Sequence, residues 1–128
     1  MRDVFLTAED NLKKHVEAMS LHLALADVWK AIAACDKYIV EPAPFKLWKD
    51  EASHHRVGTI LEVLCDALVH TARLLAPFMP ETSSRIAGLL GVDLRPLGED
   101  PPVWGTNFGA GHRVCEPEAL FPRIEAQA

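Results

Sequence analysis

Cysteine is scarce in this sequence, and its spacing shows no pairing pattern. Cys35, Cys65 and Cys115 are the only three, an odd number, and no two of them form a C-x-x-C pair. This pattern argues against a disulfide framework and against a zinc ribbon. We therefore predict neither a disulfide-stabilised secreted domain nor a structural zinc site.

Long hydrophobic runs are also missing. The composition, 49% hydrophobic and 24% charged, is that of an ordinary globular protein. No apolar run approaches the roughly 20 residues that a membrane span needs. The start, Met1 to Phe5, lacks the basic and apolar blocks of a signal peptide. We expect a cytoplasmic protein with no membrane partner, folded as one domain over residues 1–128 because this length suits a single core.

Basic charge is not in excess. The formal net charge is −5, whereas domains that bind nucleic acids usually carry a positive patch. Any contact with a polyanion must therefore come from local features of the chain. Internal repeats, low-complexity segments and strand-like alternation are absent as well.

No group of residues has the pattern of a catalytic or metal site. His54 and His55 are adjacent, so on a helix their rings point about 100° apart and do not readily share a metal. Cys65, Asp66 and His70 follow one another on a single helix, which rarely brings a nucleophile, a base and an oxyanion pocket to one point. We expect Asp66 and His70 to form a surface pair, with Cys65 near the core.

The stretch GTNFGAG, residues 105–111, superficially suggests a phosphate-binding loop. It lacks the Lys-Ser/Thr ending of such a loop, and no helical pattern follows it. We therefore predict no catalytic residue, no metal and no bound cofactor in this segment.

The hydrophobic pattern is helical. Thr7 can cap a first helix, and from Leu21 to Ile39 apolar residues recur at intervals of four and three, as on one face of a helix. Further stops come from the prolines at 77 and 80 and from Gly91. The sequence predicts an all-α helical bundle with helices at about 8–18, 21–40, 54–76 and 80–90.

Residues 92–128 have little periodicity and several glycines, which predicts an extended, irregular C-terminal arm packed back on the bundle. Apolar residues are spaced along it as possible anchors: Val103, Trp104, Val114, Leu120, Phe121 and Ile124.

The stretch EPAPFKLWKD, residues 41–50, places two prolines and two large aromatic residues directly after a long helix. Proline fixes its own φ and restricts the preceding residue, which predicts a rigid corner with a possible short turn from Phe45 to Trp48. Phe45 and Trp48 are three residues apart, so on a helical turn their rings project to one side.

Several stretches, in their order along the chain, resemble one family. They are AACDKYI (33–39), EPAPFKLWKD (41–50), LLAPFMPET (74–82), GHRV (111–114) and LFPRI (120–124). Over about residues 8–125 the chain resembles the C-terminal anticodon-binding helical domain of methionyl-tRNA synthetase, a class I aminoacyl-tRNA synthetase. LLAPFMPET is shared by several class I synthetases for hydrophobic amino acids, whereas GHRV and LFPRI point to the methionine enzyme.

The resemblance implies a helix bundle that binds the CAU anticodon of methionine tRNA during translation, with no DNA partner. Phe45, after Pro44, takes the place of the family's usual tryptophan, on which an anticodon base stacks. The alternative for Phe45 is plain packing. Trp48 either extends this platform or plugs the bundle, and Lys46 and Lys49 either meet phosphates or are simply solvated.

The family's arm braces the helices, which implies packing roles for Trp104, Phe108 and Phe121.

The chain lacks the HIGH and KMSKS signatures and the zinc knuckle of the full-length family. The resemblance therefore implies that ATP belongs to a catalytic domain outside these residues, which would be a partner of this one. The family's anticodon-reading asparagine and arginine also fall before Met1, so we expect weak, salt-sensitive RNA binding. Two alternatives stay open: a helical protein-interaction module that has lost RNA binding, and the equivalent domain of another class I synthetase.

Overall fold

The computed structural model describes residues 1–125, and within them every regular element is a helix, as the sequence predicts. The elements are α1 (Arg2–Glu17), α2 (Leu21–Val40), α3 (Pro44–Leu47), the 3₁₀ turn η1 (Glu51–Ser53), α4 (His54–Leu75) and α5 (Pro80–Leu90). The last three residues of the expected arm lie outside the described part. No helix among residues 1–125 is long and apolar enough to cross a membrane.

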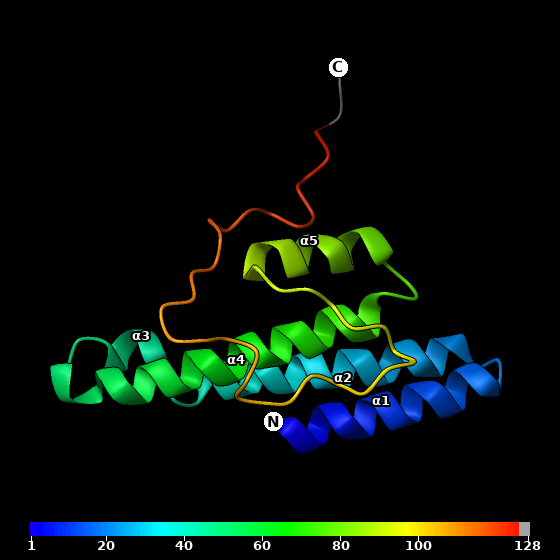
Figure 1. The fold of residues 1–128 in the computed structure, drawn as a ribbon, viewed down its shortest axis with the longest axis horizontal. Coiled ribbons are helices and arrows are strands. Elements are labelled where there is room, and N and C mark those ends of the chain that lie inside the picture. Colours follow the sequence, from blue (N-terminus) through cyan, green and yellow to red (C-terminus); the bar gives the residue numbers. More distant parts are fainter. Residues whose placement is uncertain (126–128) are drawn as a thin grey trace.

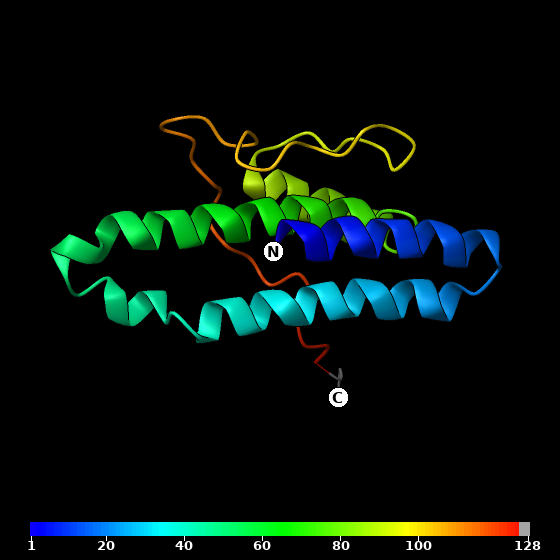
Figure 2. The same cartoon turned by 90° about the horizontal axis from the view of Figure 1, so that it is seen from below.

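Helices α1, α2 and α4 lie lengthwise beside one another, and α5 packs along α4 (Figure 1). Viewed from below, the C-terminal half of α2 and the N-terminal half of α4 extend past the start of α1 and are connected through α3 and η1 (Figure 2). The arm from residue 92 onward runs back over α4 and α5 without regular structure. The proline corner therefore lies at one tip of an elongated bundle.

The helix ends follow from proline and glycine. Pro44 and Pro80 stand in the first turns of α3 and α5, where the missing N–H of proline costs no hydrogen bond. Gly91 ends α5 with a φ of 68°, a left-handed conformation that a residue without Cβ adopts easily. The Gly91 N–H and the next amide bond back to carbonyls of α5, at Gly88 and Ala87.

Helix α1 begins at Arg2, six positions before the expected start at residue 8. Thr7 lies inside the helix and makes no cap there. Phe5, Ala8 and Leu12 are buried on one face of α1, at the helical spacing of three and four residues. The packing of Phe5 in the core extends the helix toward the N-terminus, which the capping pattern did not show.

The buried face of α2 also differs from the expected one. Its buried residues are Ala24, Asp27, Val28 and Ala31, whereas Leu21 and Ile39, at the two ends of the predicted stripe, are exposed. Alanine lets neighbouring helix backbones approach closely, and α2 packs on both α1 and α4. The middle of the stripe is buried or packs on the core, at Val28, Ile32 and Cys35, and only its ends lie outside the contact.

Polar side chains are buried along α4. Arg73 is 1% exposed and forms an ion pair with Glu9 of α1. It also donates to the carbonyl oxygens of Arg95 and Pro96, each at 3.2 Å, and of Glu99 at 2.6 Å. This one guanidinium thus holds α1, α4 and the arm together. Burial alone would raise the pKa of Glu9, but hydrogen bonds from Lys13 and Arg73 outweigh it and lower that pKa.

Asp66 and His70 are both buried and do not form the expected surface pair. Asp66 accepts hydrogen bonds from the backbone N–H of Gly105 at 2.6 Å and from Asn107 Nδ2 at 2.7 Å. His70 stacks on Trp104, with ring centroids 4.7 Å apart. Both residues thus contact the arm, which covers this side of α4.

The anchors of the arm are fewer than expected. Trp104, Phe108 and Leu120 pack against the core, whereas Val103, Val114, Phe121 and Ile124 are exposed. Phe121 is therefore not a packing residue within this chain. Polar contacts hold the arm as well, since Arg85 donates to the Leu120 and Ala119 carbonyl oxygens at 2.8 and 3.1 Å.

The burial of His70 gives stability a pH dependence. Burial, followed by the nearby charge of Arg73, lowers the pKa of His70 below its ordinary value. As the pH falls through about 6.5, the unfolded chain takes up this proton before the folded chain does, so the free energy of unfolding falls.

We expect the loss between pH 7.5 and 5.5 to be smaller in His70→Phe, which keeps a ring against Trp104. Urea unfolding of both proteins at several pH values measures the difference. This range lies above the titration of ordinary carboxylates, so Glu9 contributes little to it. Identical pH slopes for the two proteins would show that His70 does not charge on unfolding.

Candidate nucleic-acid interface

The proline corner, residues 41–50, is a rigid bend between α2 and α4. Ala43 has φ 43° and ψ 66°, a left-handed conformation that costs a residue with a Cβ about 1 to 2 kcal/mol. Pro44 follows, its side chain buried, at the first position of α3. The Lys46 N–H bonds to the Ala43 carbonyl oxygen at 2.8 Å. Phe45, which follows Pro44, therefore stands on a short and rigid helical turn.

Phe45 points its ring at solvent. The residue is 67% exposed, so it does not pack within the described part of this chain, and base stacking on it stays a prediction. An exposed benzyl group on a rigid turn loses little conformational freedom when a flat partner is laid on it, because it has only two side-chain torsions. The arrangement suits stacking with a planar ligand.

Trp48 does not plug the bundle. It is 59% exposed and stacks on His54, with ring centroids 4.1 Å apart and planes 15° apart. His54 Nε2 also donates to the Trp48 carbonyl oxygen at 2.8 Å. This contact spans the bend between α3 and α4, so it joins the corner to the first turn of α4. One face of the indole is occupied by the imidazole.

Lys46 and Lys49 are exposed beside the two rings. Neither forms an ion pair within residues 1–125. Asp50, the nearest acid in sequence to Lys49, accepts hydrogen bonds from the Ala52 N–H and the Ser53 hydroxyl at 3.2 and 2.9 Å. The two ammonium groups are thus available to an anionic ligand.

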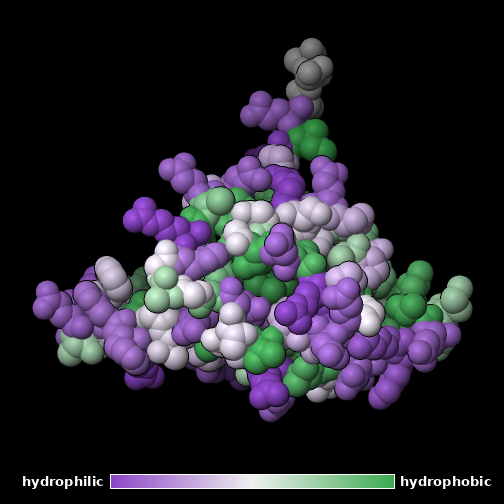
Figure 3. Space-filling model, viewed as in Figure 1, coloured by the Kyte–Doolittle hydropathy of each residue, from purple (hydrophilic) through white to green (hydrophobic). Residues whose placement is uncertain are grey.

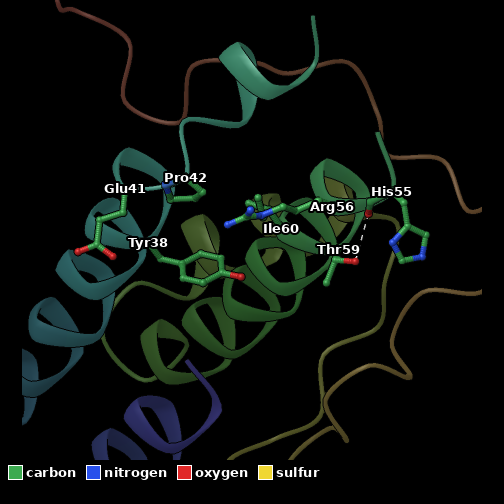
Figure 4. Close-up of a pocket in the computed structure, with 7 residues that line it drawn as sticks. All are labelled: Tyr38, Glu41, Pro42, His55, Arg56, Thr59 and Ile60. Carbon is green, nitrogen blue, oxygen red and sulfur yellow. Dashed lines mark hydrogen bonds between the residues drawn. The ribbon is translucent and has the colours of Figure 1, made fainter. Parts of the chain in front are cut away.

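A pocket of about 560 Å³ opens beside the corner (Figure 4). Its walls are Tyr38 and Glu41 from the end of α2, Pro42, and the first turns of α4, which contribute Arg56 and Thr59. Sequence reasoning did not find this pocket, because its walls come from segments that only the packing of α2 beside α4 brings together.

The residues considered above as catalytic or metal-binding candidates form no such site in the described part of the chain. Across residues 1–125 no three histidine, cysteine, aspartate or glutamate side chains gather in a way that could hold a metal. Burial and the neighbouring Asp66 raise the pKa of the Cys65 thiol, the opposite of what a thiolate nucleophile requires. His55 is exposed at the start of α4.

The surface of the bundle is mixed in hydropathy. In the space-filling view, hydrophilic residues alternate with apolar patches (Figure 3). The formal net charge of the chain is −5. A nucleic acid would therefore meet a few placed cations and rings, and not a broad positive field.

Comparison with known proteins identifies the fold and its family. A family model described as the anticodon binding domain of methionyl tRNA ligase matches residues 5–128. The chain is 32% identical to a methionine–tRNA ligase of Fusobacterium nucleatum subsp. nucleatum over 130 residues, which is 99% of this chain and 20% of that protein. It is 35% identical to the Clostridium tetani enzyme over 123 residues, 96% of this chain and 19% of that one.

Solved structures agree with these matches. The apo form of Mycobacterium tuberculosis methionyl-tRNA synthetase superposes with a TM-score of 0.78 at 29% identity, over 98% of this chain and 26% of that chain. The chain thus spans about a fifth of the length of the two curated relatives. These matches favour the methionine enzyme over the other class I synthetases. The chain belongs to the family of anticodon-binding domains of methionyl-tRNA ligases.

Proposed function

We propose that this chain recognises the CAU anticodon of methionine tRNA and serves a methionyl-tRNA synthetase in translation. The observation that carries the proposal is the exposed ring of Phe45 in the proline corner. The chain acts together with the catalytic domain of the enzyme, which binds ATP and joins methionine to the tRNA. Its own residues bind the tRNA and take no part in the chemical step.

Recognition begins with a base laid on the free face of Phe45. The bases of an anticodon loop are unstacked and can be splayed onto an aromatic ring. Such a stack contributes about 1 to 3 kcal/mol per base. Pro44 holds the turn that presents the ring, and Trp48 broadens the apolar surface on the same turn while His54 covers one of its faces.

Lys46 and Lys49 contribute the electrostatic part by contacting phosphates of the loop. Binding through two phosphates of a single strand has a salt slope of about −1.4, so affinity falls roughly sevenfold when the salt concentration rises fourfold. The net charge of −5 opposes the approach of RNA. We therefore expect binding that is weak and sensitive to salt.

A titration of the 128-residue chain with a hairpin RNA that carries the anticodon arm of methionine tRNA tests the proposal. We expect saturable binding that weakens with salt, with a slope of about −1.4 from Lys46 and Lys49 and a steeper one for each further phosphate contact. The control is the same hairpin with the three anticodon bases replaced, which should bind less tightly. Equal affinity for both hairpins would contradict anticodon recognition.

A helical protein-interaction module is the rival function. Trp29 and Val40 are exposed large apolar residues on α2, and such residues suit contact with another protein or domain. This rival predicts no binding of the hairpin at any salt concentration. The same titration therefore separates the two functions.

A further inference from the structure

We propose that the pocket between α2 and α4 holds a second nucleotide of the same RNA loop, next to the one stacked on Phe45, with Tyr38 against its base and Arg56 against its phosphate. This inference rests on the proposed function and adds a subsite to it. The pocket, about 560 Å³ in volume, lies in the size range of ligand pockets.

Tyr38 and Arg56 both reach into the pocket between α2 and α4. Figure 4 shows the Tyr38 ring and the Arg56 side chain reaching toward each other from α2 and α4, while Glu41 and His55 point away from the space between them. Pro42 and the buried Ile60 add apolar surface. A flat base fits against tyrosine and apolar walls, and a phosphate fits a guanidinium.

Arg56 is available for such a contact. It is exposed, and within the described part of the chain it takes part in no ion pair and no side-chain hydrogen bond. Glu41, the acid on the pocket wall, lies 3.7 Å from Lys37, measured between Oε1 and Nζ. The charge of Arg56 is thus not neutralised by its neighbours, whereas the nearest acid has a basic partner of its own.

The pocket and Phe45 belong to one rigid frame. Pro42 lines the pocket and precedes Phe45 by three residues, so their Cα atoms are at most about 11 Å apart. The stack of Trp48 on His54 fixes the corner to the turn of α4 that carries Arg56. Neighbouring nucleotides of one splayed loop can therefore occupy the Phe45 ring and the pocket together.

The open character of the pocket favours a strand of RNA over a free small molecule. Glu41, Arg56 and Thr59 are all exposed, so a ligand here stays largely in contact with water. A small metabolite usually buries most of its surface in its site. A nucleotide that is held by its neighbours in the strand does not need such enclosure.

The test is a titration of Arg56→Gln with the anticodon-arm hairpin, beside wild type. We expect affinity to fall roughly tenfold, the lower end of the contribution of a hydrogen bond to a charged group. With Arg56 added to Lys46 and Lys49, three phosphate contacts give wild type a salt slope of about −2.1, and in Arg56→Gln the slope should become shallower by about 0.7, to about −1.4. Arg2→Gln is the matched control: Arg2 is exposed at the start of α1, and its loss should change neither quantity.

A second variant tests the base contact. Tyr38→Leu keeps an apolar side chain but removes the aromatic face, and the hairpin should bind less tightly while the salt slope stays that of wild type. If Phe45→Ala weakens binding and Arg56→Gln matches Arg2→Gln, the pocket subsite is wrong and the proposed function stands. If wild type does not bind the hairpin, the proposed function fails and the subsite with it.

Discussion

Replacing Arg73 by methionine should destabilise the fold by about 3 to 5 kcal/mol, the usual cost of removing one partner from a buried ion pair. The substitution leaves Glu9 buried without its guanidinium partner. It also removes the donor shared by the carbonyl oxygens of Arg95, Pro96 and Glu99. Domains of this size are stable by about 5 to 15 kcal/mol, so the variant should lose a large share of its stability.

Urea unfolding followed by circular dichroism measures this loss. Arg85→Met is the matched control, because Arg85 also binds the arm, through Glu118, Ala119 and Leu120, but is partly exposed. Ion pairs at the surface contribute about 0 to 1 kcal/mol. Equal destabilisation by the two substitutions would contradict the role assigned to the buried cluster around Arg73.

The course of the helices follows from local patterns in the sequence. The expected helices at 21–40 and 80–90 coincide with α2 and α5, since proline, glycine and helical periodicity all act within a few residues. The start of α1 was missed because it depends on Phe5 packing in the core, a tertiary effect. Helix propensity and capping are weak signals when packing decides.

The buried polar residues could not be predicted from periodicity. Asp66, His70 and Arg73 are buried with the help of the arm, whose partners lie 22 to 41 residues further along the chain, while Arg73 also pairs with Glu9 of α1. An irregular arm has no repeating pattern from which its path could be read. The sequence therefore indicated a surface pair where the structure has two separate buried contacts.

The candidate site was predicted in part. The prolines at 42 and 44 indicated a rigid corner, but a hydrophobic pattern alone does not tell an exposed ring from a packed one. The family resemblance supplied the role of Phe45. The stack of Trp48 on His54 and the pocket at Tyr38 and Arg56 required the fold, because each joins residues on two different elements.

Phe45→Ala should weaken binding of the anticodon-arm hairpin by roughly 5- to 150-fold, as expected for the loss of one stacked base at 1 to 3 kcal/mol. The salt slope should stay unchanged, because no phosphate contact is removed. Phe45→Trp should bind at least as tightly as wild type, since it offers a larger face. Stability should change little in either variant because the ring is exposed.

Phe121→Ala is the matched control for this substitution. Phe121 is 68% exposed and Phe45 is 67% exposed, so both changes remove the same amount of exposed aromatic surface, but Phe121 lies on the arm. A loss of affinity in both variants would indicate a general effect of apolar surface and not stacking at the corner.

Parallel titrations of wild type, Phe45→Ala and Phe121→Ala with the one hairpin test the stacking role of Phe45 most directly. We expect Phe121→Ala to bind like wild type and Phe45→Ala to bind at least fivefold more weakly, the lower limit for a stacked base. Equal affinities of Phe45→Ala and wild type would contradict recognition of the anticodon by this ring.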